Sequence, residues 1–190
     1  LLADIGQGHN VVSTVFVECG SMYNASVDKA MAPVGETEFV NGIAAMSASG
    51  QYGPAKLCAG IVSYADLTLG DDVGPVLDAH IVASPRFRGI RHAAGWDASE
   101  AIRNSHTKPT ENLFLEEKFQ RGFAQLEKRG LSFDAWLYHP QITDLTVLAK
   151  AFPKVTIVFD HFGGPLGIGP YSGKGEEIFN QWQIARCADH

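Results

Sequence analysis

The chain alternates apolar, β-rich runs with stretches of helical periodicity, and this alternation restricts its fold more than any other feature. Strands that are apolar almost throughout and that are separated by helices are typical of a parallel sheet covered on both faces. The expected strands are residues 11–19, 57–64, 87–92, 132–139 and 155–161. The expected fold class is therefore α/β.

Helical spacing of apolar residues predicts helices over residues 34–52, 71–83, 113–129 and 144–152, and another over the tail at 176–188. The expected inner face of the first helix comprises Phe39, Val40, Ile43, Ala44 and Met46. That of the second comprises Val73, Val76, Leu77 and Ile81, and that of the third comprises Leu115, Phe119, Phe123 and Leu126. Gly130 is the expected C-terminal stop of the third helix.

Five strand-then-helix units are compatible with a barrel or with a doubly wound sheet. No strand-linked GxGxxG motif is present, which argues mildly against a dinucleotide-binding sheet. A complete barrel of eight units needs about 250 residues, so 190 residues are short by two or three strands. We expect one domain over residues 1–190 that forms an incomplete portion of a (β/α)8 TIM barrel.

Composition excludes several classes of partner. Hydrophobic residues make up 45% of the chain and charged residues 19%, enough apolar material for a core. The net charge of −6 and the absence of a Lys/Arg run argue against nucleic acid and acidic membranes as partners. No run approaches the roughly 20 apolar residues of a membrane span. We expect a small-molecule substrate, and the composition leaves a homo-oligomer open.

The three cysteines, Cys19, Cys58 and Cys187, lie far apart without a CxxC spacing. They therefore suggest neither a disulfide framework nor a thiolate zinc site. A reducing, cytoplasmic location fits this usage best.

Two histidines terminate expected strands, where parallel α/β folds collect their chemistry. His161 precedes the sequence FGGP, whose glycines and proline force a turn and hold the imidazole at the rim. Such a histidine can exchange protons, donate a hydrogen bond to a carbonyl or bind a metal ion. His139 precedes Pro140 in the same way, and a structural role is equally open for it.

Charged groups end other strands. Arg91 is the better placed of the two arginines in FRGIRH to hold a substrate carboxylate, and an ion pair is its structural alternative. Glu18 ends a very hydrophobic strand, as a site carboxylate or as a salt-bridge partner. His92 is expected to shape the adjoining loop and to contribute to substrate binding. Asp160 is interpreted as a structural acceptor, and the glycine-rich segment 167–175 as a lid.

The segments FVECGSMY, PVGETEFVNGIAAMSASG, FRGIRHAAGWD, WLYHPQI and VFDHFGGP together resemble the amidohydrolase-2 family of the amidohydrolase superfamily. The branch is similar to 2-pyrone-4,6-dicarboxylate lactonases and sugar-acid lactonases. The resemblance covers essentially the whole chain and assigns its strands to family strands two to six. The family's first-strand His-x-His pair and last-strand catalytic aspartate have no counterpart here, so a fragment of a longer protein is expected.

The resemblance implies a lactonase-like hydrolase, with His161 polarising the carbonyl and Arg91 anchoring an acidic substrate. His139, Glu18 and His92 are expected at the substrate. The resemblance also implies either one divalent metal ion, Zn or Mn, with His161 and His139 as its ligands, or no metal. A related decarboxylase or C–C hydrolase is the enzymatic alternative, and a non-catalytic half-barrel scaffold or binding subunit is the other.

Overall fold

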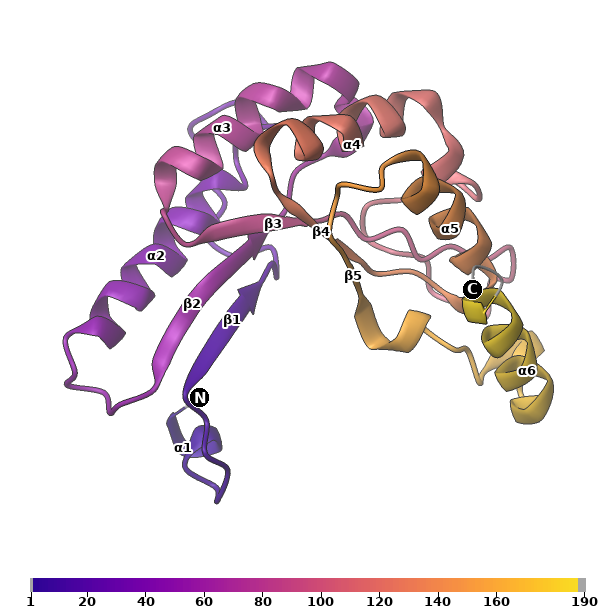
Figure 1. The fold of residues 1–190 in the computed structure, drawn as a ribbon, viewed down its shortest axis with the longest axis horizontal. Coiled ribbons are helices and arrows are strands. Elements are labelled where there is room, and N and C mark those ends of the chain that lie inside the picture. The colour runs from indigo at the N-terminus through magenta and orange to yellow at the C-terminus, as the bar shows by residue number, and fades with distance from the viewer. Residues whose placement is uncertain (1, 188–190) are drawn as a thin grey trace. The chain divides into compact units, whose positions relative to one another are not determined.

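The computed structural model describes residues 2–187, which divide into two compact units. One unit contains the described residues up to 65 together with residues 74–90, and the other contains residues 66–73 and those from 91 onward. Each unit has strands and helices of its own (Figure 1).

The first unit pairs its three strands in sequence order. It comprises helix α1 (Leu2–Ile5), strand β1 (Ser13–Val17), helix α2 (Val34–Ala48), strand β2 (Lys56–Ser63), helix α3 (Gly74–Ala83) and strand β3 (Phe87–Arg91), whose last residue belongs to the second unit. All pairs are parallel, with Phe16 opposite Ile61 and Val62 opposite Gly89. Figure 1 shows α2 and α3 on the same side of these strands. The parallel α/β prediction is confirmed here.

The core of the first unit lies between α2 and β2. It contains Val40, Ala44, Ala55, Leu57, Cys58 and Ile61. Phe39 and Met46 were expected on the inner face, but they are 43% and 48% exposed. The expectation was wrong because α2 buries a narrower stripe, at Thr37, Val40, Ala44 and Ser47, than the apolar residues of its sequence suggest. Ile81 of α3 is likewise exposed.

Three buried polar side chains connect α2, β2 and α3. The hydroxyls of Thr37 and Ser63 lie 2.5 Å apart, and the Thr37 hydroxyl lies 2.8 Å from Nδ1 of His80. Nε2 of His80 lies 3.1 Å from the carbonyl oxygen of Tyr64, so it donates the hydrogen bond to that carbonyl. Burial lowers the pKa of His80 to about 4. The imidazole is therefore neutral at physiological pH and serves the packing of this unit.

The second unit contains the remaining elements. They are the 3-10 helices η1 (Leu67–Val73) and η2 (Leu113–Leu115), helix α4 (Glu117–Arg129), strand β4 (Ser132–Ala135), 3-10 helix η3 (His139–Gln141), helix α5 (Ile142–Ala151), strand β5 (Ile157–Phe159), 3-10 helices η4 (Asp160–Gly163) and η5 (Gly169–Tyr171), and helix α6 (Gly175–Cys187). β4 and β5 are parallel, with Asp134 opposite Val158. Residue 188, the expected end of the last helix, lies outside the described residues.

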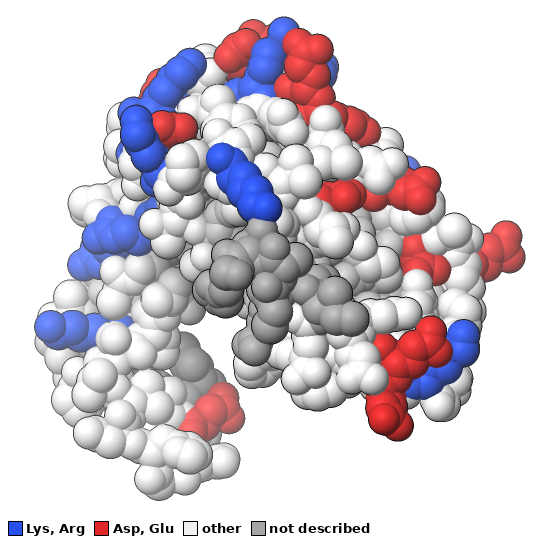
Figure 2. All heavy atoms as spheres, turned by 45° about the vertical axis from the view of Figure 1, so that its right-hand side comes forward, with Lys and Arg blue, Asp and Glu red and all other residues white. Residues whose placement is uncertain are grey.

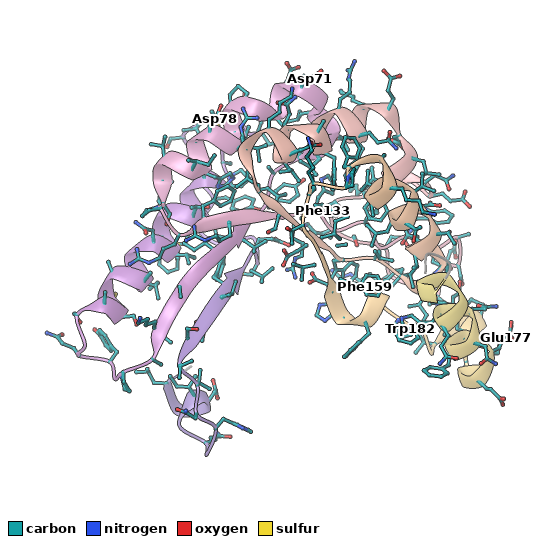
Figure 3. The ribbon with its side chains drawn as sticks, in the orientation of Figure 1. Asp71, Asp78, Phe133, Phe159, Glu177 and Trp182 are labelled. Carbon is teal, nitrogen blue, oxygen red and sulfur yellow. The ribbon has the colours of Figure 1, made fainter. Side chains whose placement is uncertain are left out.

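Phenylalanines form the centre of the second unit. Phe119 and Phe123 of α4 meet Phe133 of β4, with ring centroids 6.2 and 5.1 Å apart (Phe133 is labelled in Figure 3). All three side chains are fully buried, which stabilises the fold by about 2 kcal/mol per ring. Gly130 ends α4 with a φ of 63°, as predicted. Leu115 is 41% exposed, because it belongs to a 3-10 turn before α4 and not to the helix face.

Two strands end earlier than the sequence suggests. The expected strand 132–139 stops at Ala135, and His139 begins a 3-10 turn. The expected strand 155–161 stops at Phe159. From residue 161 the chain has positive φ values of 50°, 55°, 74° and 55° at His161, Phe162, Gly163 and Gly164. Because left-handed backbone cannot continue a parallel ladder, His161 lies inside the turn η4, which begins at Asp160.

Charge is mixed on the visible surface. Figure 2 shows Lys and Arg next to Asp and Glu at the top of the view, with uncharged side chains between other charged groups. None of the described helices is both long and apolar enough to span a membrane.

Candidate functional site

An arginine at the end of β3, an aspartate of β4 and an aspartate just after β5 influence one another electrostatically in the second unit. Nη1 of Arg91, the last residue of β3, lies 3.7 Å from Oδ2 of Asp160, the residue that follows β5. Asp134 of β4 lies opposite Val158, two residues before Asp160. Asp160 begins the 3-10 helix η4 just beyond β5. Since side chains alternate along a strand, Asp134 and Val158 project from the same face. That face is the one opposite Phe133 and helix α4.

Burial governs the electrostatics of this cluster. Asp134 is 5% exposed, and desolvation followed by the charge of Asp160 raises its pKa from 3.8 to about 6, against a lowering by Arg91. Oδ1 of Asp134 and Oδ2 of Asp160 are buried and accept no hydrogen bond from the described residues. The arrangement can therefore hold or release a proton near neutral pH.

His161 lies in the turn after β5. It is exposed, and its left-handed backbone is unusual for a residue other than glycine. Conformations of this kind concentrate where a side chain must take a particular direction. The adjoining Gly164 has no room for a side chain, because a Cβ there would lie 2.2 Å from the carbonyl oxygen of Leu137. The turn that presents His161 is thus fixed by close backbone packing.

His139 lies at the start of η3 and is 3% exposed. Its Nδ1 accepts a hydrogen bond from the backbone N–H of Leu166 at 3.3 Å, and its ring meets the edge of Tyr171, with centroids 5.1 Å apart. Burial lowers its pKa, and the Gln181 side chain and the Asp97 charge oppose this. The ring therefore holds the segment that follows η4, and its role at the substrate remains a prediction.

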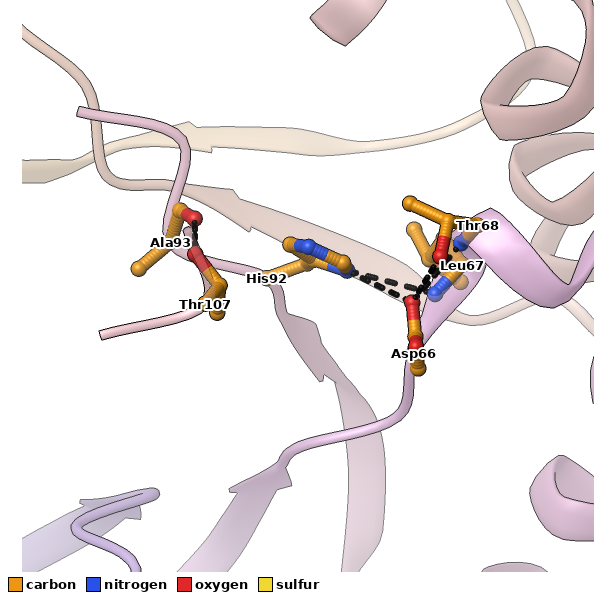
Figure 4. A network of polar contacts seen from close by, with 6 residues as sticks. All are labelled: Asp66, Leu67, Thr68, His92, Ala93 and Thr107. Carbon is orange, nitrogen blue, oxygen red and sulfur yellow. Dashed lines mark hydrogen bonds and ion pairs between the residues drawn. The ribbon is translucent and has the colours of Figure 1, made fainter. Parts of the chain in front are cut away.

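His92 follows β3 directly and is buried (Figure 4). Its Nδ1 accepts a hydrogen bond from the backbone N–H of Leu67 at 3.2 Å and lies 4.0 Å from a carboxylate oxygen of Asp66. Its ring packs edge-on against Phe119. These contacts fix the start of η1. A role for His92 in substrate binding stays a prediction.

Glu18 belongs to the first unit, where it follows β1 and is buried. A second buried carboxylate lies in the same unit: Oε1 of Glu36 accepts hydrogen bonds from the backbone N–H groups of Ser21 at 2.7 Å and of Cys19 at 3.3 Å. Burial, followed by the charges of Glu36 and Glu18, raises the pKa of Tyr23 above its ordinary value. Glu36 therefore fixes the loop after β1 at its carboxyl end.

A cavity of about 420 Å³ lies elsewhere in the second unit. Its lining includes Trp96, Asp97, Glu111, Asp144 and Tyr171. The hydroxyl of Tyr171, in the glycine-rich segment expected to be a lid, donates a hydrogen bond to Asp97 at 2.7 Å. Three carboxylates in the lining disfavour an anionic ligand. A substrate carboxylate is thus better served by Arg91 than by this cavity.

The predicted site residues are only partly brought together. Arg91 forms an ion pair with Asp160, the neighbour of His161 in sequence. His139 and His92 are buried with backbone partners of their own. Sequence reasoning missed Asp134. One acidic residue within the apolar run SFDAWL is nevertheless a signal, because burying a carboxylate costs free energy unless the group is paired or has a function.

Among residues 2–187, no three His, Cys, Asp or Glu side chains are grouped so that they could hold a metal ion. The described side chains therefore do not by themselves fit a metal ion, and the expected Zn or Mn remains a prediction.

Comparison with known proteins identifies similar sequences. A family model described as Amidohydrolase matches residues 55–183. The protein y4mH of Sinorhizobium fredii is 35% identical over 137 residues, which are 69% of this chain and 40% of that protein. The chain thus spans about two fifths of the length of this relative.

Two crystal structures of an amidohydrolase from Burkholderia multivorans are similar in fold. The one with bound zinc has a TM-score of 0.54 at 20% identity, covering 79% of this chain and 44% of its own. The one with bound HEPES has a TM-score of 0.52 at 15% identity, covering 93% and 63%. At these identities the likeness concerns the fold alone. It confirms the prediction of an incomplete portion of a (β/α)8 TIM barrel.

Proposed function

Since the chain belongs to the amidohydrolase family, we propose that it forms part of a hydrolase that opens small lactones at the C–O ester bond. Water adds to the lactone carbonyl carbon, the bond to the ring oxygen breaks, and that oxygen takes up a proton. Such a reaction needs a group that polarises the carbonyl and a group that positions the substrate.

The observation that carries this proposal is the placement of Arg91 at the end of β3. Its side chain is only 20% exposed, so its charge acts where water is scarce. A guanidinium in such a place suits a substrate carboxylate. His161, exposed in a fixed turn after β5, is the proposed group that polarises the carbonyl.

The experiment uses the full-length protein that carries this chain. Hydrolysis of 2-pyrone-4,6-dicarboxylate and of D-galactono-1,4-lactone is followed in a pH-stat, with carbon dioxide release measured in parallel. We expect acid release with at least one lactone and no carbon dioxide. Carbon dioxide release would instead identify a decarboxylase, and turnover of neither lactone would contradict the proposal.

His161→Ala tests the role of the turn. We expect kcat to fall by about 100-fold or more, because a group that acts on the carbonyl in the transition state contributes on this scale. His9→Ala is the matched control, since His9 is also exposed but precedes β1 in the first unit. Near-normal turnover in a well-folded His161→Ala protein would remove His161 from the site.

A further inference from the structure

The charge balance around Arg91 sets a condition on any anion that binds there. One guanidinium is accompanied by two carboxylates, Asp160 at 3.7 Å and Asp134, whose titration responds to both of its neighbours. With both carboxylates ionised, the cluster carries one net negative charge and repels a substrate carboxylate. With one of them protonated, the cluster is neutral and the guanidinium can be shared with a ligand.

The geometry indicates which carboxylate takes the proton. Asp134 lies within β4 and is nearly inaccessible, whereas Asp160 lies after β5 and has the ion pair with Arg91. The charges that act on Asp134 come from Asp160 and Arg91. On the opposite face of β4, Phe133 meets the apolar ring of Phe123. The unsatisfied Oδ1 of Asp134 therefore lacks the donors that would stabilise its charge.

We propose that Asp134 is a positioning residue that makes carboxylate binding at Arg91 depend on proton uptake: the ligand binds when Asp134 is protonated and is repelled when it is ionised. The proposal rests on the proposed function for the role of Arg91 as an anchor. Asp134 itself does not touch the ligand.

The pKa of Asp134, raised to about 6, puts this switch within the physiological range. Below that value Asp134 is neutral, and the ligand meets the Arg91–Asp160 pair without the charge of Asp134 nearby. Above it, each further pH unit lowers the population of the binding-competent form by about tenfold. The site is therefore expected to bind dicarboxylates more tightly in mildly acidic conditions. The affinity for neutral lactones is expected not to depend on the protonation of Asp134.

The test measures binding apart from catalysis. Isophthalate, an inert ring with two carboxylates, is titrated calorimetrically into the full-length protein at several pH values, with isophthalamide as the neutral control. Between about pH 5.5 and 7.5 we expect the Kd of isophthalate to rise by about 20-fold, because the protonated fraction falls by that factor. The Kd of isophthalamide is expected to stay constant. An isophthalate Kd that does not change with pH would overturn the proposal.

Two variants separate this role from a structural one. In Asp134→Asn the Kd of isophthalate is expected to stay within about 2-fold of the low-pH value of the wild type throughout the range. In Asp160→Asn, the Kd of isophthalate is expected to depend much less on pH, because Arg91 balances the charge of an ionised Asp134 once residue 160 is neutral. If Asp134→Asn does not fold, Asp160→Asn decides alone. Either variant with the pH dependence of the wild type would contradict the proposal.

The two proposals fail in different ways. Loss of lactone turnover with pH-dependent binding of isophthalate would reject the proposed hydrolysis and leave the role of Asp134 standing. Turnover of a carboxylated lactone together with pH-independent binding of isophthalate would support the proposed hydrolysis and reject the role of Asp134.

Discussion

Individual buried polar residues determine the chemistry available to this chain. Asp134, its two charged neighbours and the left-handed His161 are concentrated at the ends of β3 and β5 and within β4. His80 performs the opposite task in the first unit, where a neutral imidazole connects two helices and a strand. The pKa of Asp134 is raised and that of His80 is lowered, so both side chains favour their uncharged forms in the fold. Both therefore make the stability of the fold depend on pH.

Asp134→Asn is expected to stabilise the fold above neutrality. The folded-state pKa of Asp134, about 6, exceeds its ordinary 3.8, so its contribution to stability is present at low pH and is lost as pH rises through 6. Near pH 7.5 the substitution should raise the free energy of unfolding by about 1–3 kcal/mol, and below about pH 4 the gain should vanish. Urea denaturation across this range measures it, with the exposed Asp72→Asn as control. A loss of stability at high pH would contradict the expectation.

His80→Gln is expected to change the pH dependence of stability in the acidic range. The pKa of His80 in the fold, about 4, lies below the ordinary 6.5, so its contribution is complete above 6.5 and declines as pH falls toward 4. The wild type should lose up to about 3 kcal/mol over this interval. The variant should lack that slope and be about 1–2 kcal/mol less stable near pH 7.5, since a hydrogen bond is lost. Urea denaturation of both proteins between pH 4 and 7.5 measures this dependence, with His9→Gln as control. If the free energy of unfolding depends equally on pH in the wild type and in His80→Gln, His80 does not cause the dependence.

At the scale of elements, the sequence identified the strands and helices but not their ends or their exact faces. Nearly continuous apolar runs predicted all five strands. The runs did not show that β1 and β5 are less buried than β2 and β4. Local periodicity could not predict that β4 ends at Ala135 or β5 at Phe159, because turns built on left-handed residues and on packing against distant backbone end these strands. The exposed Phe39 and Met46 show a similar limit, since only neighbouring elements decide how wide a stripe α2 buries.

The packing of α4 on η1 gives a prediction at this scale. A Cβ on Gly122 would lie 2.1 Å from the carbonyl oxygen of Leu67, and neither backbone can give way cheaply. We expect Gly122→Ala to lower the free energy of unfolding by about 2–4 kcal/mol. In α2, Gly42→Ala is the matched control, because nothing lies within 4 Å of its Cβ, and it should stabilise by about 0.5–1 kcal/mol. Equal effects of the two substitutions in urea denaturation would show that the close approach is absent.

At the scale of the whole molecule, the family is established, and the chain spans less than half of the length of two of the proteins that it resembles. The matched region is 40% of y4mH and 44% of the zinc-bound structure. The groups that the resemblance assigns to water activation, a His-x-His pair and an aspartate, have no counterpart among these 190 residues. The roles proposed for His161 and Arg91 therefore require the rest of such a site.

Residues 1–190 expressed alone should accordingly hydrolyse neither 2-pyrone-4,6-dicarboxylate nor D-galactono-1,4-lactone. A full-length form comparable in length to its relatives should hydrolyse at least one of them. The intact mass of the native protein and the turnover of both forms provide the measurement. Substantial turnover by the isolated 20.5 kDa chain would contradict the division of the site. A native mass near 20.5 kDa without turnover would favour the scaffold alternative.

The sequence by itself determined the α/β class, the order of the strands and the candidates at strand ends, because apolar periodicity and turn residues are local signals. Only the tertiary structure decided which candidates share an environment: it paired Arg91 with Asp160 and gave His92 and His139 backbone partners. It also buried Asp134 beside the Arg91–Asp160 pair. Desolvation and charge coupling depend on residues that are distant in the chain, and no local pattern encodes them.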